Sequence, residues 1–253
     1  MSFITHKPLF VFVLAFAGLW LAAWLGVLLK RWRPLSEDLR QDFGLILAAT
    51  LTLLGLLIGF SFSMAASRYD QRKNYEEAEA NAIGTEYVRA DLLPAADAAK
   101  MRDLLKKYVE QRIRFYTADD LEVGQVNTQT AQLQGNMWSA VLTPAALQPT
   151  PIVALAVSGM NDVLNAQGYT QAAWWNRIPA SAWVLTGIIA VCCNILIGYG
   201  SRGAAPGNRL LLILPLFVAL AFMLIDDIDT PRHGLIRVVP QNLTSLAASL
   251  QPR

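Results

Sequence analysis

The chain has 253 residues, of which 54% are hydrophobic and 16% charged, so it is too apolar for an average soluble domain and too charged to be buried throughout. The formal net charge is +2, but residues 69 to 178 carry 10 Lys and Arg against 13 Asp and Glu, which excludes a basic nucleic-acid-binding surface there. The composition therefore predicts a membrane protein with a soluble part and no nucleic-acid partner.

Four uncharged runs have about the length that a helix needs to cross a bilayer. They are Pro8 to Leu29, Gly44 to Ser67, the run between Arg177 and Arg202, and the run between Arg209 and Asp226. The first is longer than the apolar region of a signal peptide, about 7–15 residues, so it is interpreted as a retained helix. The fourth has only 16 residues and contains Pro215, which predicts that Asp226 lies close to the membrane boundary or in a water-filled cavity.

A soluble helical domain is expected between the second and third runs. Residues 68 to 93 are helical in pattern up to Pro94, and residues 96 to 116 carry an apolar stripe at helical spacing with Lys and Arg opposite. Strand patterns are nearly absent. The chain thus divides into transmembrane helices 1 and 2 (1–67), a helical soluble domain that continues helix 2 (68–177), transmembrane helices 3 and 4 (178–226) and a soluble tail (227–253).

Whether residues 137–160 form a fifth span is left open, because they are uncharged and largely apolar. Three prolines, Pro144, Pro149 and Pro151, interrupt this stretch, and prolines in the middle of a span need special compensation. We therefore expect two soluble helices separated at LQPTP. A fifth span would place the C-terminus on the opposite side of the membrane.

The second apolar run has two adjoining faces at helical spacing. Gly55, Gly59 and Ser63 follow one another every four residues, a spacing that lets helix backbones approach closely in lipid. A second row at the same interval consists of Thr52, Leu56 and Phe60. Either both faces pack within one subunit, or one packs against a neighbour while the other faces elsewhere.

The same run resembles the bestrophins, a family of pentameric ion channels with four spans and a large helical cytosolic part. The resemblance rests on a Gly-Phe pair, Gly59 and Phe60, followed eight residues after the Phe by Arg68 and then Tyr69. The blocks RYDQRKNYEEAEANAIGTEYVRADLLP and DTPRHGLIRV are similar to bacterial bestrophin-like membrane proteins. This resemblance implies an all-α membrane protein that assembles into a ring.

The resemblance also implies a pore neck of three apolar side chains on helix 2. Carried over from the Gly-Phe and Arg anchors, the neck positions are Thr52, Leu56 and Phe60. Thr52 departs from the apolar pattern, and Asp70 replaces a second aromatic after the arginine. Rings of Leu and Phe on symmetry-related helices would form a hydrophobic constriction, with Gly55, Gly59 and Ser63 packing the helices around it.

Charged residues follow this run within three turns. Arg68, Arg72, Glu76 and Glu79 are candidates for a pore mouth or vestibule. Other interpretations are a solvated helical face for Arg72 and Glu76, an interhelical contact for Glu79, and a membrane anchor or an ion-pair partner for Arg68.

Three carboxylates come directly after the fourth run. Asp226, Asp227 and Asp229 supply the oxygen ligands that calcium prefers, although no EF-hand loop accompanies them. A divalent cation site is one interpretation, and an ion-paired or helix-ending cluster is the other. The chain has two histidines and no HExxH, GxSxG, Walker A or GxGxxG sequence, so no catalytic motif supports an enzyme and no other cofactor is expected.

We therefore expect an oligomeric ion channel, with a pentamer favoured, in contact with membrane lipids and inorganic ions. Its selectivity is undecided, with a lean to cations. A non-conducting scaffold or receptor that binds a partner through its soluble helices is the alternative. The expected location is the bacterial inner membrane as a multi-pass protein. The basic loops favour an external soluble domain, but the basic residues after helix 2 and the resemblance favour the cytosolic side.

Overall fold

The computed structural model describes residues 8–201 and 209–251, and within them it is all helical, without a strand. The elements are α1 (Pro8–Trp32), α2 (Arg40–Arg89), the 3-10 helix η1 (Ala90–Leu92), α3 (Ala95–Thr117), α4 (Val123–Leu147), α5 (Pro151–Trp175), α6 (Ala180–Gly200), the 3-10 helix η2 (Arg209–Leu212), α7 (Ile213–Asp229) and α8 (Gln241–Ser249). Arg202, which bounds the third apolar run, lies outside the described residues.

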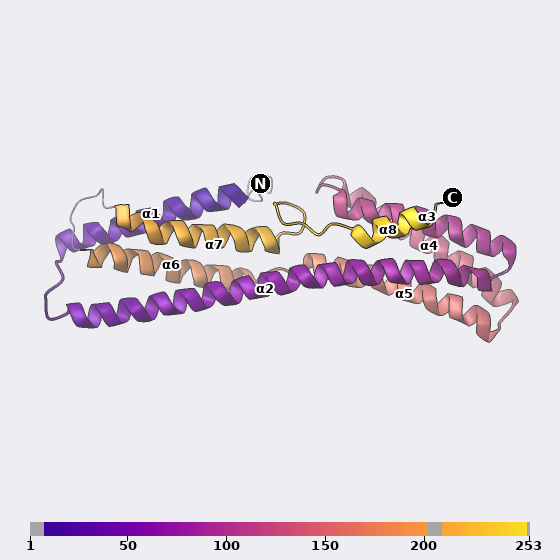
Figure 1. Cartoon of the computed structure of the whole chain (residues 1–253), viewed down its shortest axis with the longest axis horizontal. Coiled ribbons are helices and arrows are strands. Elements are labelled where there is room, and N and C mark those ends of the chain that lie inside the picture. Colours follow the sequence, from indigo (N-terminus) through magenta and orange to yellow (C-terminus); the bar gives the residue numbers. More distant parts are fainter. Residues whose placement is uncertain (1–7, 202–208, 252–253) are drawn as a thin grey trace. The chain divides into compact units, whose positions relative to one another are not determined.

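The chain divides into two compact units. The first comprises Met1–Arg68 and Arg177–Ile236, and the second comprises Tyr69–Asn176 and Arg237–Arg253. The expected soluble tail at 227–253 is thus divided between the two units, because its first ten residues belong to the first unit. Helix α2 is the longest element in Figure 1 and continues from the first unit into the second, as expected for helix 2 and its extension.

Four helical stretches are long and apolar enough to cross a membrane: Pro8–Trp32, Arg40–Leu92, Pro151–Gly200 and Arg209–Asp229. The third stretch takes in both α5 and α6. Since α5 buries Val153, Ala156 and Met160 in the core of the second unit, α6 is the part suited to the bilayer. Pro215 falls in the first turn of α7, where a backbone N–H would have no helical acceptor and a proline is tolerated.

Close backbone contact between α1 and α6 organises the first unit. A Cβ added at Gly26 would collide with the backbone carbonyl of Ile195, and one at Gly198 would collide with that of Ala23. The glycines therefore let the two helices cross without intervening side chains, as is common where helices meet in membranes. A small core beside this crossing contains Leu19, Leu54, Ala190, Cys193, Val218 and Phe222.

The second unit is a helical bundle around a larger core. The stripe expected on residues 96 to 116 is the buried face of α3, with Met101, Leu105, Tyr108 and Val109 fully buried. Helices α4 and α5 form the expected pair on either side of a short turn. The Thr150 side chain accepts a hydrogen bond from the N–H of Val153, 3.2 Å, and Pro151 starts α5, which is a standard helix beginning.

Candidate functional site

The row expected at the neck lies on the exposed side of α2. In the single chain Leu56 is 52% exposed and Phe60 is 61% exposed, and Thr52 is exposed as well. The Thr52 hydroxyl donates to the carbonyl of Ala48 at 2.9 Å. Because the helix backbone accepts this hydrogen bond, the Thr52 side chain is less polar than a threonine with a free hydroxyl group.

The row of small residues, Gly55, Gly59 and Ser63, is exposed in the part of the chain that the structure describes. A Cβ built on Gly55 or Gly59 would meet no atom within 4 Å, and Ser63 is exposed. The interpretation in which both faces pack within one subunit is therefore wrong. Leu54 and Ala65 are the buried residues of the apolar half of α2, so most of this half is left for lipid or for another chain.

The exposed face continues along the soluble half of the same helix. Exposed residues recur every three or four positions after Ser63, on the side opposite the buried stripe of α2. We call this set the α2 strip, and it comprises Thr52, Leu56, Phe60, Ser63, Ser67, Asp70, Asn74, Glu77, Asn81, Thr85 and Val88. Its polar part was not predicted as a site, although extending the period from Phe60 would have found it.

Arg68 is held by an ion pair. Its Nη1 atom lies 3.6 Å from Oδ1 of Asp229, and both side chains are mostly buried in the first unit. Asp229 also accepts hydrogen bonds from the N–H of Ile178, the closer at 3.0 Å. This contact joins the middle of α2 and the end of α7 to the segment before α6, and it favours the ion-pair interpretation of Arg68.

Arg72 and Glu76 are buried and stabilise helix ends in the second unit. The Arg72 guanidinium donates to the carbonyls of Ala173 and Asn176, both at 3.2 Å, at the C-terminal end of α5. The Glu76 carboxylate accepts from the N–H of Leu243 at 2.9 Å and from the Asn242 amide at 2.6 Å, at the start of α8. Both charges suit the helix dipoles that they face.

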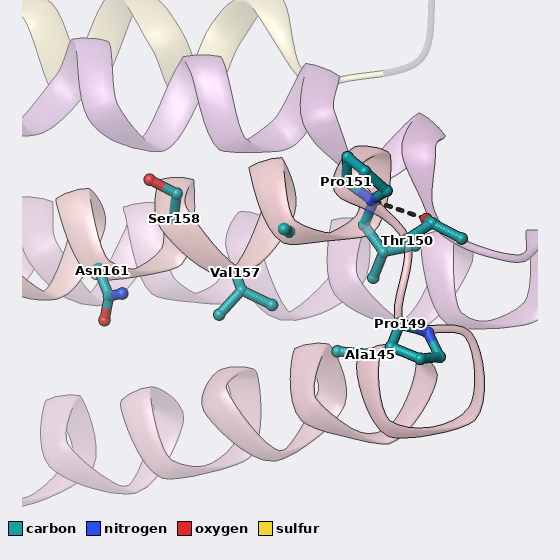
Figure 2. A pocket seen from close by; sticks show the side chains of 9 residues that line it. Ala145, Pro149, Thr150, Pro151, Val157, Ser158 and Asn161 are labelled. Carbon is teal, nitrogen blue, oxygen red and sulfur yellow. Dashed lines mark hydrogen bonds between the residues drawn. The ribbon is translucent and has the colours of Figure 1, made fainter.

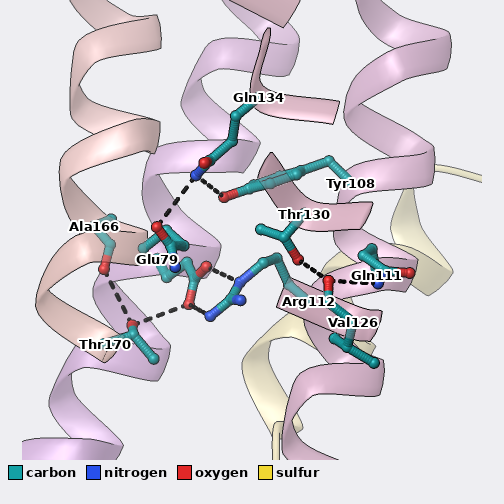
Figure 3. Close-up of polar contacts among 10 residues, drawn as sticks. Glu79, Tyr108, Gln111, Arg112, Val126, Thr130, Gln134, Ala166 and Thr170 are labelled. Carbon is teal, nitrogen blue, oxygen red and sulfur yellow. Dashed lines mark hydrogen bonds and ion pairs between the residues drawn. The ribbon is translucent and has the colours of Figure 1, made fainter. Parts of the chain in front are cut away.

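Glu79 forms a fully buried ion pair with Arg112 of α3. Figure 3 shows Arg112 Nε donating to Glu79 Oε1 at 2.5 Å, and Thr170 of α5 donating to Glu79 Oε2 at 3.0 Å. Burial lowers the pKa of Arg112, but the adjacent Glu79 carboxylate raises it, and the net direction is upward. Burial, together with the charge of Glu79, raises the pKa of Tyr108, whose hydroxyl accepts from Gln134 at 3.1 Å.

The expected role of Arg72, Glu76 and Glu79 in lining a mouth or vestibule is therefore wrong. Their exposed fractions are 0%, 2% and 0%, because each side chain points into the bundle and bonds to another helix. They fix the second half of α2 to α3, α5 and α8. The interhelical contact left open for Glu79 is the arrangement found.

The three aspartates after the fourth run do not gather as ligands. Oδ1 and Oδ2 of Asp227 accept from the N–H groups of Leu235 and Ile236, at 2.8 and 3.0 Å. Gly234 in this loop has φ +129°, and a Cβ there would collide with the Asp227 carboxylate. Among the described residues no three His, Cys, Asp or Glu side chains could hold a metal ion. The contact explains why Gly234 of the DTPRHGLIRV block occurs opposite Asp227, which lies two residues before that block.

A shallow groove of about 600 Å³ lies beside the turn between α4 and α5. Ala145, Pro149, Pro151, Val157 and Asn161 are among its lining residues (Figure 2). No charged side chain lines it, so it offers apolar contact and few polar anchors.

The fold and the α2 strip together define an all-helical, multi-pass membrane protein with one long helix exposed along its length. A bestrophin-like domain matches residues 9–243. The chain therefore belongs to the bestrophin-like family, which in general is a family of ion channels rather than enzymes.

Crystal structures of a bacterial bestrophin homolog from Klebsiella pneumoniae have a similar fold. One of them has a TM-score of 0.61 at 13% identity, covering 96% of each chain. Two point-mutant structures give TM-scores of 0.62 and 0.63 at 11% and 13% identity, each covering 94% of this chain and 97% of the other. No curated protein matches the sequence.

Proposed function

We propose that the chain is the subunit of an oligomeric ion channel whose pore is lined by the α2 strip. The single observation that supports this most is the strip itself, which is exposed from Thr52 to Val88 and changes from apolar to polar at Ser63 and Ser67. A helix that faced lipid throughout its apolar half would have no need of polar residues continuing the same face. A helix that lines a constriction and then a water-filled vestibule would need that sequence of side chains.

The neck of this channel consists of Thr52, Leu56 and Phe60 from each subunit. Rings of Leu and Phe side chains resist wetting and would hold the resting conductance low. One helix per subunit cannot enclose a pore, so the proposal requires a ring. Gly55 and Gly59, where an added Cβ would meet no atom of the described residues within 4 Å, would let neighbouring helices approach one another around it. A pentamer is proposed from the family resemblance.

The channel is proposed to prefer cations. Asp70 and Glu77 are the charged residues of the α2 strip, and neither makes an ion pair within the described residues. Two of the neighbouring basic residues lie elsewhere, since Arg68 pairs with Asp229 and Arg72 is buried against α5. Lys73 is exposed one helical turn from both Asp70 and Glu77, with its Nζ 5.9 Å from the centre of the Tyr69 ring, and it offsets one of the two negative charges. Rings of carboxylates raise the local concentration of cations and repel anions.

Further parts of the proposal concern the setting of the channel. It lies in a bacterial inner membrane, in contact with lipid, with its helical unit in the cytosol. It transports inorganic ions and needs no cofactor for conduction.

The test is ion flux in proteoliposomes for Phe60→Ala and, as a matched control, Phe62→Ala. Both phenylalanines are exposed on α2, but Phe62 lies on a different side from the strip. The proposal predicts several-fold faster flux for Phe60→Ala and wild-type flux for Phe62→Ala. Equal flux in the two variants and the wild type would contradict it, and purified protein that is monomeric would favour the alternative of a non-conducting scaffold.

A further inference from the structure

Glu86 is a buried carboxyl group that no contact described so far uses. It lies on the inner face of α2, two turns after Glu79, and its exposed fraction is 0%. Unlike Arg72, Glu76 and Glu79, it has no hydrogen-bond partner for either carboxyl oxygen among the described residues. Isolated ionised carboxylates are costly to bury, so such a group is stable only when it is neutral or paired.

Gly159 of α5 leaves the space that this carboxyl group occupies. A Cβ added at Gly159 would collide with Oε2 of Glu86 and would lie 2.5 Å from Nη1 of Arg89. The glycine thus lets α5 pass directly over the Glu86 carboxyl group. Both carboxyl oxygens are closed off from solvent there.

The charged groups around Glu86 offset only part of the cost of burying its ionised form. Arg89, one turn further along α2, directs its guanidinium to Asp162 of α5, with Nη1 and Oδ2 3.6 Å apart. Arg89 and Asp162 are the charged groups that act on Glu86 from the two helices, and their effects oppose each other. Burial, as the largest cause, raises the pKa of Glu86 from 4.5 to about 8, with Arg89 lowering it and Asp162 raising it.

We propose that Glu86 and Gly159 form a proton-binding site in the helical unit, in which a neutral Glu86 allows α2 and α5 to pack and an ionised Glu86 separates them. The ligand is a single proton, bound at the Glu86 carboxyl group. Its release would put a charge between two helices at a contact where the carboxyl group is buried and accepts no hydrogen bond from the described residues. The site makes the stability of the α2–α5 contact depend on pH, whether or not the chain conducts ions.

The sign of this dependence follows from linkage. Between pH 4.5 and about 8 the folded unit keeps the Glu86 proton while the unfolded chain has lost it. The contribution of Glu86 to the free energy of unfolding is therefore fully present below pH 4.5 and declines as the pH rises toward 8. Above pH 8 it stays constant.

The experiment is thermal unfolding of the full chain in detergent across this pH range, for the wild type, Glu86→Gln and the control Glu110→Gln. Gln keeps the shape of the neutral group but cannot ionise, and Glu110 is an exposed residue of α3. The wild type and Glu110→Gln should lose melting temperature more steeply than Glu86→Gln between pH 4.5 and 8. Equal slopes in all three proteins would overturn the proposal.

A second measurement covers the case in which Glu86→Gln does not fold. Infrared difference spectra of the wild type should contain the band of a protonated carboxylic acid at pH 7 that disappears well above pH 8. Asp162→Asn removes a neighbouring negative charge and should move this midpoint to lower pH. A midpoint unchanged by Asp162→Asn, or no protonated acid at pH 7, would also overturn the proposal.

Discussion

Burial separates the charged residues that follow the apolar half of α2 into two groups. Arg72, Glu76 and Glu79 point inward and bond to other helices, whereas Asp70 and Glu77 point outward. A sequence shows that these residues lie within a few turns of one another, but small rotations about the helix axis decide which of them meets water. Arg72, Glu76 and Glu79 were therefore the wrong residues for a vestibule, because charge was weighed without the helical phase.

The buried pair of Glu79 and Arg112 should behave as a unit. Replacing Arg112 with Met leaves an unpaired buried carboxylate and should destabilise the second unit by about 3–5 kcal/mol. Replacing both, as Glu79→Leu with Arg112→Met, should cost less than the sum of the two single changes, because no charge is left unpaired. Thermal or denaturant unfolding of the three variants measures this coupling, and additive losses would contradict the assigned ion pair.

Helix contacts in the first unit depend on glycines that the sequence pattern did not single out. The spacing of Gly55 and Gly59 drew attention to α2, yet Gly26 and Gly198 are the glycines whose missing side chains permit a close crossing. Pairwise complementarity between α1 and α6 is not visible in either helix alone. The helical class and the approximate bounds of α1 to α7, in contrast, follow from apolar runs and prolines that each segment carries by itself, whereas α8 in the tail was not predicted.

The crossing of α1 and α6 should tolerate no added methyl group. Gly26→Ala and Gly198→Ala each place a Cβ against the backbone of the other helix, which cannot move aside as a side chain would, and each should cost about 1–3 kcal/mol. Gly18→Ala in α1 and Gly187→Ala in α6 are matched controls, since a Cβ at either position meets no atom within 4 Å. Melting temperatures in detergent should fall for the first pair only, and equal effects in both pairs would refute the close crossing.

In the whole molecule, one helix carries both the proposed neck and the proposed vestibule. Asp70→Asn with Glu77→Gln removes the charges of the α2 strip and should lower the ratio of cation to anion permeability, most clearly at low ionic strength. Glu76→Gln is the control for a neighbouring buried carboxylate, and it should affect stability rather than selectivity. Reversal potentials in a salt gradient give the ratio, and an unchanged ratio in the double variant would remove the basis for cation preference.

The most direct test of the pore-lining role of α2 is flux block by a charged thiol reagent in single-cysteine chains. Cys192 and Cys193 are first replaced with alanine, and Ser63→Cys is compared with Phe62→Cys, its neighbour on another side of the helix. We predict that the reagent stops ion flux through the Ser63→Cys channel and leaves flux through the Phe62→Cys channel unchanged. Flux that is unaffected at Ser63→Cys although the thiol has reacted would show that α2 does not line the path of the ions.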